Sequence, residues 1–456
     1  MDPYLLPESP VRSLDEYLAG ETGGLGLARA RELGPAATVD EIARSGLRGR
    51  GGAGFPTGRK WRSIVGAGAG RRYVVCNAAE GEPATFKDRA LIRANPYQLL
   101  EGVLIAAGAV EAEAVYLALK ASFEPELARV TEAAQEMQVA GLARECEINI
   151  VAGPEDYLYG EEKALLEVIE GRDALPRLFP PYEHGLFARD IVTGWEGSDG
   201  GRAANPQAAN PTLVNNVETL CNVPHVLARG ADWFRGRGTA ASPGHLVCTV
   251  VGDVVAPDVG EVELGTPLGA VVDAVGSGLP PGRTVKAVLP GVAAPVVTDL
   301  STPLSYEGFE RSGSAMGAGG YFVLDDTACA IGAALVVSRF LAEESCGQCP
   351  PCKLGSTEIT ERLARIEAGD GATGDLDAIE HWLGHVTDGN RCYLAVQERL
   401  VVASLLRTFP DELEQHLTRR SCPRPRPIVL PKLVDLTGGV ATYAAPGREG
   451  RSDGLR

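Results

Sequence analysis

The chain has 456 residues, of which 45% are hydrophobic, so it is long enough for about three domains and can bury large cores. Its net charge of −17 at pH 7 argues against nucleic acid as a partner, because an acidic surface repels a phosphate backbone. The N-terminus lacks a basic segment followed by an apolar run, and no stretch reaches about 18 uninterrupted apolar residues. We therefore expect no signal peptide and no direct membrane insertion. The ten cysteines then indicate a reducing, cytoplasmic location, or a peripheral one on the inner face of a membrane complex.

The first 240 residues show the alternating pattern of an α/β domain. Short helices are expected over 13–45, with Thr38 as an N-cap, and a glycine-rich loop follows at 46–58. Buried strands are predicted at 72–77, 114–119 and 147–151, and the helices predicted between and after them lie at 96–110, 125–139 and 161–170. This order predicts a Rossmann-like domain over 1–240 with a largely parallel sheet, whose ligands would lie at the carboxyl ends of the strands.

The remaining chain divides by pattern into further segments. Residues 189–211 are rich in Gly, Ala, Asn and Pro, which is typical of a surface insertion. Short alternating strands with one helix at 267–275 predict a small mixed β domain over 243–325. Residues 326–422 are predicted to be helical, and 423–456 to form an extended tail.

Four cysteines follow a spacing that indicates a metal centre. Cys346, Cys349 and Cys352 read C-x2-C-x2-C, and Cys392 follows after 39 residues. Four Cys ligands suit a [4Fe-4S] cluster. Zinc is the main alternative, although structural zinc sites usually use two C-x2-C pairs, and disulfides fit a reducing compartment poorly. The other cysteines follow no spacing rule and are expected to be ordinary core or surface residues; they are Cys76, Cys146, Cys221, Cys248, Cys329 and Cys422.

The glycine-rich loop has the composition of an anion-binding loop. Bare glycines let backbone N–H groups approach an anion closely, and the loop contains Gly49, Gly51, Gly52 and Gly54. Arg50 and Lys60 add positive charge, and Phe55 or Trp61 offers a flat face for a ring. The loop is neither a Walker A sequence nor a G-x-G-x-x-G motif after a first strand, so a flexible turn remains the alternative.

A second polar motif, at 76–89, follows the first predicted strand. Asn77 suits a polar heteroaromatic edge, while Glu80 and Glu82 are potential acceptors for ribose hydroxyls. The alternative is an ordinary charged loop in which Lys87 and Asp88 are solvated.

Two further motifs lie at predicted helix starts. The segment 157–165 contains Tyr157, Gly160, Glu161 and Glu162, and the helix dipole alone would favour its glutamates. The segment 210–220 contains Asn215, Asn216 and Thr219; its paired asparagines would cap a helix or read a ring carbonyl and imide.

The four motifs and the cysteine set, in this order over about 40–420, resemble the NADH-binding flavoprotein subunit of respiratory complex I. The matching subunits of NAD-linked hydrogenases and formate dehydrogenases share this pattern. The resemblance implies an FMN/NADH-binding α/β domain, a ubiquitin-like β-grasp domain of the SLBB type at 243–325 and a helical bundle holding a [4Fe-4S] cluster. It implies FMN contacts by Gly49, Arg50, Gly52, Lys60, Asn77, Tyr157, Gly160, Glu161, Glu162, Asn215, Asn216 and Thr219. NADH would stack on the flavin and on Phe55, near Glu82 and Glu162, and the cluster ligands would be Cys346, Cys349, Cys352 and Cys392.

The implied function is oxidation of NADH through FMN and the cluster, with electrons passed to a partner protein that holds further iron–sulfur centres. The chain departs from the family pattern mainly on the nucleotide side, at Ser63, Ala79 and Phe179 among other positions. These departures favour an alternative, an electron-relay or scaffold subunit with an intact cluster and a degenerate nucleotide site, which receives electrons from a partner redox protein. A ligand-binding module centred on the β-grasp domain is a further alternative.

Overall fold

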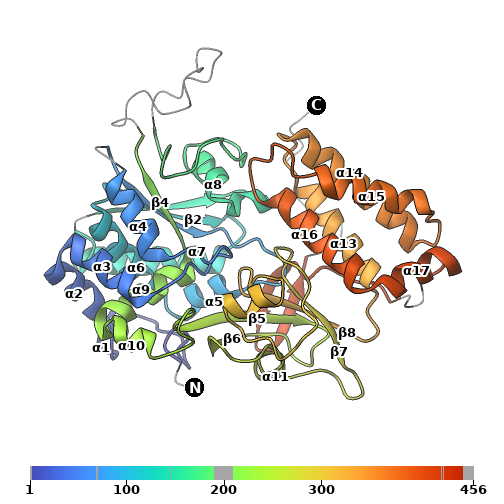
Figure 1. Cartoon of the computed structure of the whole chain (residues 1–456). Helices are drawn as coiled ribbons and strands as arrows, with labels where there is room; N and C mark the ends of the chain where they lie inside the picture. The colour runs from blue at the N-terminus through green and yellow to red at the C-terminus, as the bar shows by residue number, and fades with distance from the viewer. Residues whose placement is uncertain are drawn as a thin grey trace, which may run out of the picture. The chain divides into compact units, whose positions relative to one another are not determined.

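The computed structural model describes residues 3–67, 70–144, 146–188, 209–422, 424 and 426–444 (Figure 1). The chain forms two compact units. The first contains residues 1–80, 87–247 and 261–265, and the second contains 81–86, 248–260 and 266–456. Of the predicted insertion at 189–211, residues 189–208 lie outside the described residues.

The first unit contains the α/β domain. Its elements are α1 (Leu14–Ala19), α2 (Leu25–Leu33), α3 (Pro35–Ser45), α4 (Thr57–Gly66), β1 (Tyr73–Ala78), α5 (Lys87–Ala94), α6 (Pro96–Val110), β2 (Ala114–Lys120), α7 (Glu124–Val139), β3 (Glu147–Gly153), the 3-10 helix η1 (Tyr157–Gly160), α8 (Glu162–Ile169), β4 (Thr212–Asn216), α9 (Val217–Arg229) and α10 (Ala231–Arg235).

A four-stranded parallel sheet in the order β3-β2-β1-β4 forms the centre of this unit. The three strands predicted from the sequence are β1, β2 and β3, so the predicted parallel sheet is confirmed. The residues of β1 are almost all buried, as expected for a parallel strand covered on both faces. Helices α6 and α9 pack on each other and on β1, and nearly every residue of α6 is buried. The hydrophobic core therefore lies between the sheet and this helix pair.

The N-terminal helices differ from the prediction in one detail. Thr38 does not cap a helix, because α3 already begins at Pro35, a residue type favoured in the first helical turn. Its hydroxyl instead donates to the carbonyl of Gly34 at 2.8 Å.

The second unit begins with a small mixed sheet, which confirms the mixed β region predicted from the sequence. Its strand order is β6-β5-β8-β7, with β5 parallel to β8 and β7 antiparallel to β8. The elements are β5 (His245–Gly252), β6 (Asp258–Glu263), α11 (Leu268–Gly276), β7 (Val285–Pro290), α12 (Tyr306–Arg311) and β8 (Gly320–Asp325), where β5 and β6 run across the boundary between the units. The helix predicted at 267–275 is α11.

The rest of the second unit is helical, as predicted. It contains α13 (Ala330–Glu344), α14 (Pro350–Glu367), α15 (Thr373–His385), α16 (Leu394–Thr408) and α17 (Pro410–Arg419). Helix α13 packs on both α14 and α16, and α15 packs on α14 (orange and red in Figure 1). Within the predicted tail, β9 (Leu433–Thr437) and β10 (Val440–Tyr443) form an antiparallel hairpin. In the described part of the chain, no helix combines the length and hydrophobicity needed to cross a bilayer.

Candidate functional site

The sheet of the first unit has a topological switch point between β1 and β4. The chain proceeds from β1 to β2 and β3 on one side, and then returns to place β4 on the other side of β1. Open α/β sheets bind ligands at the carboxyl ends of strands at such a point. Asn77 of β1 lies beside Asn216 of β4 there, and Cys76 lies beside Asn215. The second and fourth motifs of the sequence thus meet at the edge where a ligand is expected.

The glycine loop is closed at its base by hydrogen bonds. The amide of Gly49 donates to the carbonyl of Phe55 at 2.8 Å, and Nε of Arg48 donates to the carbonyl of Gly54 at 2.7 Å. Gly52 and Gly54 have φ angles of 122° and 61°, which favour glycine over residues with a Cβ. The loop is therefore a defined turn, and the flexible-turn alternative does not describe it.

This loop reaches the carboxyl edge of the sheet through two contacts. The amide of Arg50 donates to Oγ1 of Thr219 in α9 at 2.8 Å. A Cβ built on Gly51 would lie 3.1 Å from Cβ of Asn216, so a side chain at Gly51 would crowd the asparagine. The first motif is thus joined to the fourth, and Gly51 lies where the backbone approaches β4 closely.

The third motif reaches the same edge. Nδ2 of Asn77 donates to the carbonyl of Gly160 at 2.7 Å, and Nζ of Lys60 lies 2.9 Å from a carboxylate oxygen of Glu162. Glu161 is the N-cap of α8, where its carboxylate accepts from the amides of Lys163 and Ala164. Burial raises the pKa of Glu161 to about 7. Its backbone N–H donates to the carbonyl of Leu158 in η1, the 3-10 helix that also contains Tyr157.

The two aromatic residues of the glycine loop have different environments. Trp61 is fully buried, and its indole N–H donates to Oδ1 of Asn215 at 2.9 Å. The expectation that Trp61 offers a flat face to a ligand is therefore wrong. Phe55 is 48% exposed, with Arg59 stacked over its ring at 5.4 Å, so Phe55 is the aromatic face available to a ring.

A buried charge network under this edge was missed by the sequence analysis. Lys87 and Asp88 are buried, so the expectation that they are solvated is wrong. Nζ of Lys87 lies 2.7 Å from Asp88 and 3.0 Å from Glu218, and Nδ2 of Asn216 donates to Asp88 at 2.6 Å. Asn216 also caps α9 by accepting from the amide of Glu218. The only sequence signal was the Lys-Asp pair in the motif that follows β1, and such a pair is more often solvated.

The two glutamates of the second motif are bonded within the protein. Glu80 accepts from Nε of Arg89 and from the amide of Asp88, each at 3.0 Å. Glu82 belongs to the second unit, where its carboxylate accepts from the amide of Val292 at 2.7 Å. Contacts of either carboxylate with ribose hydroxyls remain predictions.

The structure of the first unit also contains an atom that a ligand would satisfy. Oγ1 of Thr57, in the first turn of α4 directly after the glycine loop, is buried and has no hydrogen-bond partner among the described residues. Buried polar atoms are normally hydrogen-bonded, so this hydroxyl fits a bound polar group such as that of FMN.

The four predicted cluster cysteines lie around the start of α14 and the segment before α16. Cys349 is the residue before α14, Cys352 lies in its first turn, and Cys392 precedes α16 by two residues. Nη1 of Arg391 donates to Oε1 of Gln348 at 3.0 Å, so the segment with Cys392 is joined to the C-x2-C-x2-C loop.

Polar groups already surround the sulfur atoms of this set. Nε2 of Gln348 lies 3.7 Å from Sγ of Cys346, and Oγ of Ser345 lies 3.4 Å from Sγ of Cys352. Burial, together with the charges of Cys349 and Cys346, raises the pKa of the Cys352 thiol. All ten cysteines of the chain are described, and no disulfide joins any two of them. Hydrogen bonds to ligand sulfurs are a feature of iron–sulfur sites, so the residues fit the cluster.

Comparison with known proteins identifies both regions. Residues 42–225 match the family model described as Nuo51 FMN-binding domain. Residues 332–416 match the model described as NADH-ubiquinone oxidoreductase-F iron-sulfur binding region.

Three relatives match about nine tenths of this chain. The F 2 subunit of the NADH-quinone oxidoreductase of Rhizobium meliloti (strain 1021) is 36% identical over 438 residues, which are 92% of this chain and 99% of the relative. The F subunit of the NADH-quinone oxidoreductase of Streptomyces coelicolor is 37% identical over 90% of this chain and 89% of its own. The HndC subunit of the NADP-reducing hydrogenase of Solidesulfovibrio fructosivorans is 35% identical over 90% of this chain and 82% of its own.

A solved structure shares the fold. The crystal structure of an NAD+-reducing [NiFe]-hydrogenase in the air-oxidized state matches 90% of this chain and 67% of its own, with 31% identity and a TM-score of 0.75. The chain therefore belongs to the family of NADH-quinone oxidoreductase F subunits, the NADH-oxidising subunits that carry FMN and a [4Fe-4S] cluster.

Proposed function

We propose that FMN binds at the carboxyl edge of β1 and β4, between the glycine loop and the starts of α8 and α9. The observation that supports this assignment is the set of hydrogen bonds that joins four separate motifs at the switch point: Arg50 to Thr219, Asn77 to Gly160 and Asn216 to Asp88. These contacts fix the polar side chains before any ligand arrives. A site whose groups are already oriented loses little side-chain entropy on binding.

In this proposal each residue has a limited task. The glycine loop and Lys60 supply N–H groups and positive charge for the phosphate, while Asn77, Asn215 and Asn216 orient the ring system. Phe55 supplies an exposed face for the nicotinamide ring, and Glu162 lies near the nucleotide. When bound, FMN supplies the redox chemistry, accepting a hydride from NADH and releasing electrons singly.

We further propose that Cys346, Cys349, Cys352 and Cys392 are the four cluster ligands and that the chain works beside other iron–sulfur subunits. Its relatives are named as subunits of quinone oxidoreductases and hydrogenases, which supports such an assembly. Electrons that reach the cluster must pass to an acceptor, so we expect a partner protein with a further iron–sulfur centre. A cytoplasmic location, peripheral to any membrane part of the assembly, fits this proposal.

The first experiment is a visible spectrum of the anaerobically purified chain before and after addition of NADH. Flavin bleaching together with loss of the broad iron–sulfur absorbance supports the proposed NADH site. A spectrum that ignores NADH and responds to dithionite would instead favour the relay role suggested by Ser63, Ala79 and Phe179.

The FMN assignment has its own test. Asn77→Ala removes one of the ring-orienting amides, and the loss of one such hydrogen bond is expected to weaken FMN binding by about tenfold to hundredfold. Asn149→Ala is the matched control, because Asn149 lies in the middle of β3 and bonds only weakly to the carbonyl of Val115, at 3.4 Å. Equal FMN affinities in the two variants would refute the assignment of Asn77.

A further inference from the structure

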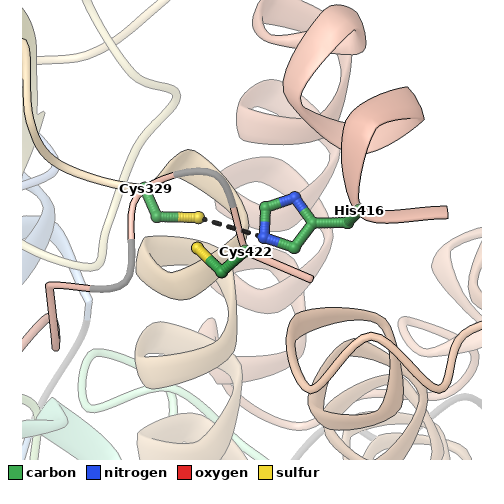
Figure 2. A group of neighbouring side chains, drawn as sticks. All are labelled: Cys329, His416 and Cys422. Carbon is green, nitrogen blue, oxygen red and sulfur yellow. Dashed lines mark hydrogen bonds between the residues drawn. The ribbon is translucent and has the colours of Figure 1, made fainter. Parts of the chain in front are cut away.

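A second group of metal-binding side chains lies in the second unit and shares no residue with the four predicted cluster ligands. Cys329, His416 and Cys422 bring Sγ, Nε2 and Sγ within 4.8 Å of one another. Figure 2 shows the two sulfur atoms and the imidazole edge pointing toward a common point. Cys329 precedes α13, His416 lies in the last turn of α17, and Cys422 follows α17. Three separate stretches of chain therefore meet at this group.

The spacing of the donor atoms fits a tetrahedral zinc site. Bond lengths of about 2.3 Å for Zn–S and about 2.05 Å for Zn–N place a sulfur and a nitrogen ligand about 3.6 Å apart, and two sulfurs about 3.8 Å apart. Sγ of Cys329 lies 3.5 Å from Nε2 of His416. This pair already has the separation of two ligands of one zinc ion, and Sγ of Cys422 lies within 4.8 Å of both atoms.

The imidazole of His416 is held in the tautomer that a metal requires. Its Nδ1 lies 2.7 Å from the backbone carbonyl of Glu412, and because a carbonyl only accepts, Nδ1 carries the proton. Nε2 then presents its lone pair to the two sulfurs. Metal-ligating histidines commonly donate their other N–H to a carbonyl in this way.

Further contacts fix the surroundings of the ring. The carboxylate of Glu412 accepts from the amide of Ala330 at 2.9 Å and lies 3.0 Å from Nη1 of Arg424. One residue of α17 therefore bonds to the start of α13 and to the segment after Cys422. This arrangement holds the three donor groups together without relying on the metal.

We propose that Cys329, His416 and Cys422 bind one zinc ion, with water as the fourth ligand. Thiolate and imidazole are preferred ligands of Zn²⁺, and a set of two sulfurs and one nitrogen disfavours the hard cations that prefer oxygen ligands. Binding releases one proton from each thiol, so the charge of the ion is balanced by two thiolates. Cys422 is only half-buried, which leaves the fourth position toward solvent. The ion clamps the segment after α17 to the start of α13.

A disulfide between Cys329 and Cys422 is the competing state of the same residues. It would leave His416 without a metal and would be expected only after oxidation. The two states differ in metal content and in the mass of the alkylated protein, so one experiment separates them.

The test measures zinc and iron per chain by mass spectrometry of the full-length protein, purified anaerobically without chelators. We expect about one zinc per chain in the wild type, beside the four irons of a [4Fe-4S] cluster. Cys329→Ser and Cys422→Ser are expected to lower zinc by at least about tenfold and to leave iron unchanged. Cys146→Ser is the matched control, because Cys146 lies in the first unit, where its thiol contacts the carbonyls of Ala112 and Glu147.

Zinc-edge absorption of the wild type adds a reading that does not depend on any variant. Two sulfur ligands at about 2.3 Å and nitrogen or oxygen ligands at about 2.0–2.1 Å are expected. Absence of zinc, even after incubation with zinc chloride, overturns the proposal, as does a disulfide in the anaerobic protein. If a serine variant loses iron as well as zinc, the zinc-edge spectrum decides, and a spectrum without sulfur ligands overturns the proposal.

Discussion

Glu398 is a buried acid whose protonation should control the pH dependence of stability in the helical region. It lies in α16 and is fully buried. One carboxyl oxygen accepts from Oγ of Ser338 at 2.6 Å, and that hydroxyl also lies 2.7 Å from Oγ1 of Thr360. The other oxygen has no hydrogen-bond partner among the described residues. Burial, which is opposed only by the Ser338 hydrogen bond, raises the pKa of Glu398 from 4.5 to about 8.

The sign of the effect follows from proton binding. Between pH 4.5 and pH 8 the folded chain holds a proton on Glu398 that the unfolded chain has released, so stability falls as pH rises through this range. The loss between pH 6 and pH 8 is about 2 kcal/mol for these two pKa values. Glu398→Gln is neutral at both pH values and keeps an acceptor for Ser338. The variant should therefore lack this part of the pH dependence.

The assay is the unfolding temperature at pH 6 and pH 8, followed by helical circular dichroism under anaerobic conditions. The wild type should lose about 4–8 °C more than Glu398→Gln between the two pH values, at about 2–4 °C per kcal/mol. Comparing the two proteins at each pH cancels the titration of all other groups. Glu380→Gln, an exposed glutamate of the same helical region, should behave like the wild type. Equal pH dependence in the wild type and Glu398→Gln would refute the reasoning.

Three shorter predictions address the cluster, the packing and the buried charges. Cys392→Ser should abolish the iron–sulfur signal in electron paramagnetic resonance, because a four-cysteine cluster loses one ligand; an unchanged signal would exclude Cys392. Gly58→Ala should destabilise the first unit by about 1–3 kcal/mol, because the added Cβ would lie 2.4 Å from Cα of Ala43; denaturant unfolding checks this. Lys87→Met should cost about 3–5 kcal/mol, because it removes the buried cation that Asp88 and Glu218 share; a chain as stable as the wild type would contradict this.

Elements with a strong local pattern were predictable from the sequence. The apolar β1 and its alternation with helices predicted the parallel sheet. The C-x2-C-x2-C spacing of Cys346, Cys349 and Cys352 indicated the metal centre. In each case the signal lies within a few consecutive residues. Strand β4 was missed, because it is short and ends in two asparagines, which are typical of turns and caps.

Features that depend on distant partners were not predictable. A lysine in a charged run is usually solvated, but Lys87 is buried beside Glu218, to which the chain returns more than 100 residues later. Trp61 belongs to a residue type that often stacks on ligands. Its indole N–H instead donates a hydrogen bond to Asn215, more than 150 residues away. The same holds for Cys329, whose partner in the proposed zinc site, His416, follows 87 positions later. A spacing rule that covers a few consecutive residues cannot identify pairs that lie so far apart in the sequence.

At the switch point of the first unit, the residues of the recognised motifs and the residues that the sequence did not reveal have different roles. The residues with recognisable motifs, such as Asn77 and Lys60, lie where a ligand would meet them, and each already has a protein partner. The residues that the sequence did not reveal, Lys87 and Asp88, lie beneath and orient Asn216 through hydrogen bonds. Because a cofactor site functions only when its groups are held within a fraction of an ångström, the hidden network is as necessary as the visible motif. Exchange of Asp88 for Asn, which removes its charge and leaves its shape, should therefore weaken FMN binding without any direct contact, and FMN titration of this variant tests that dependence.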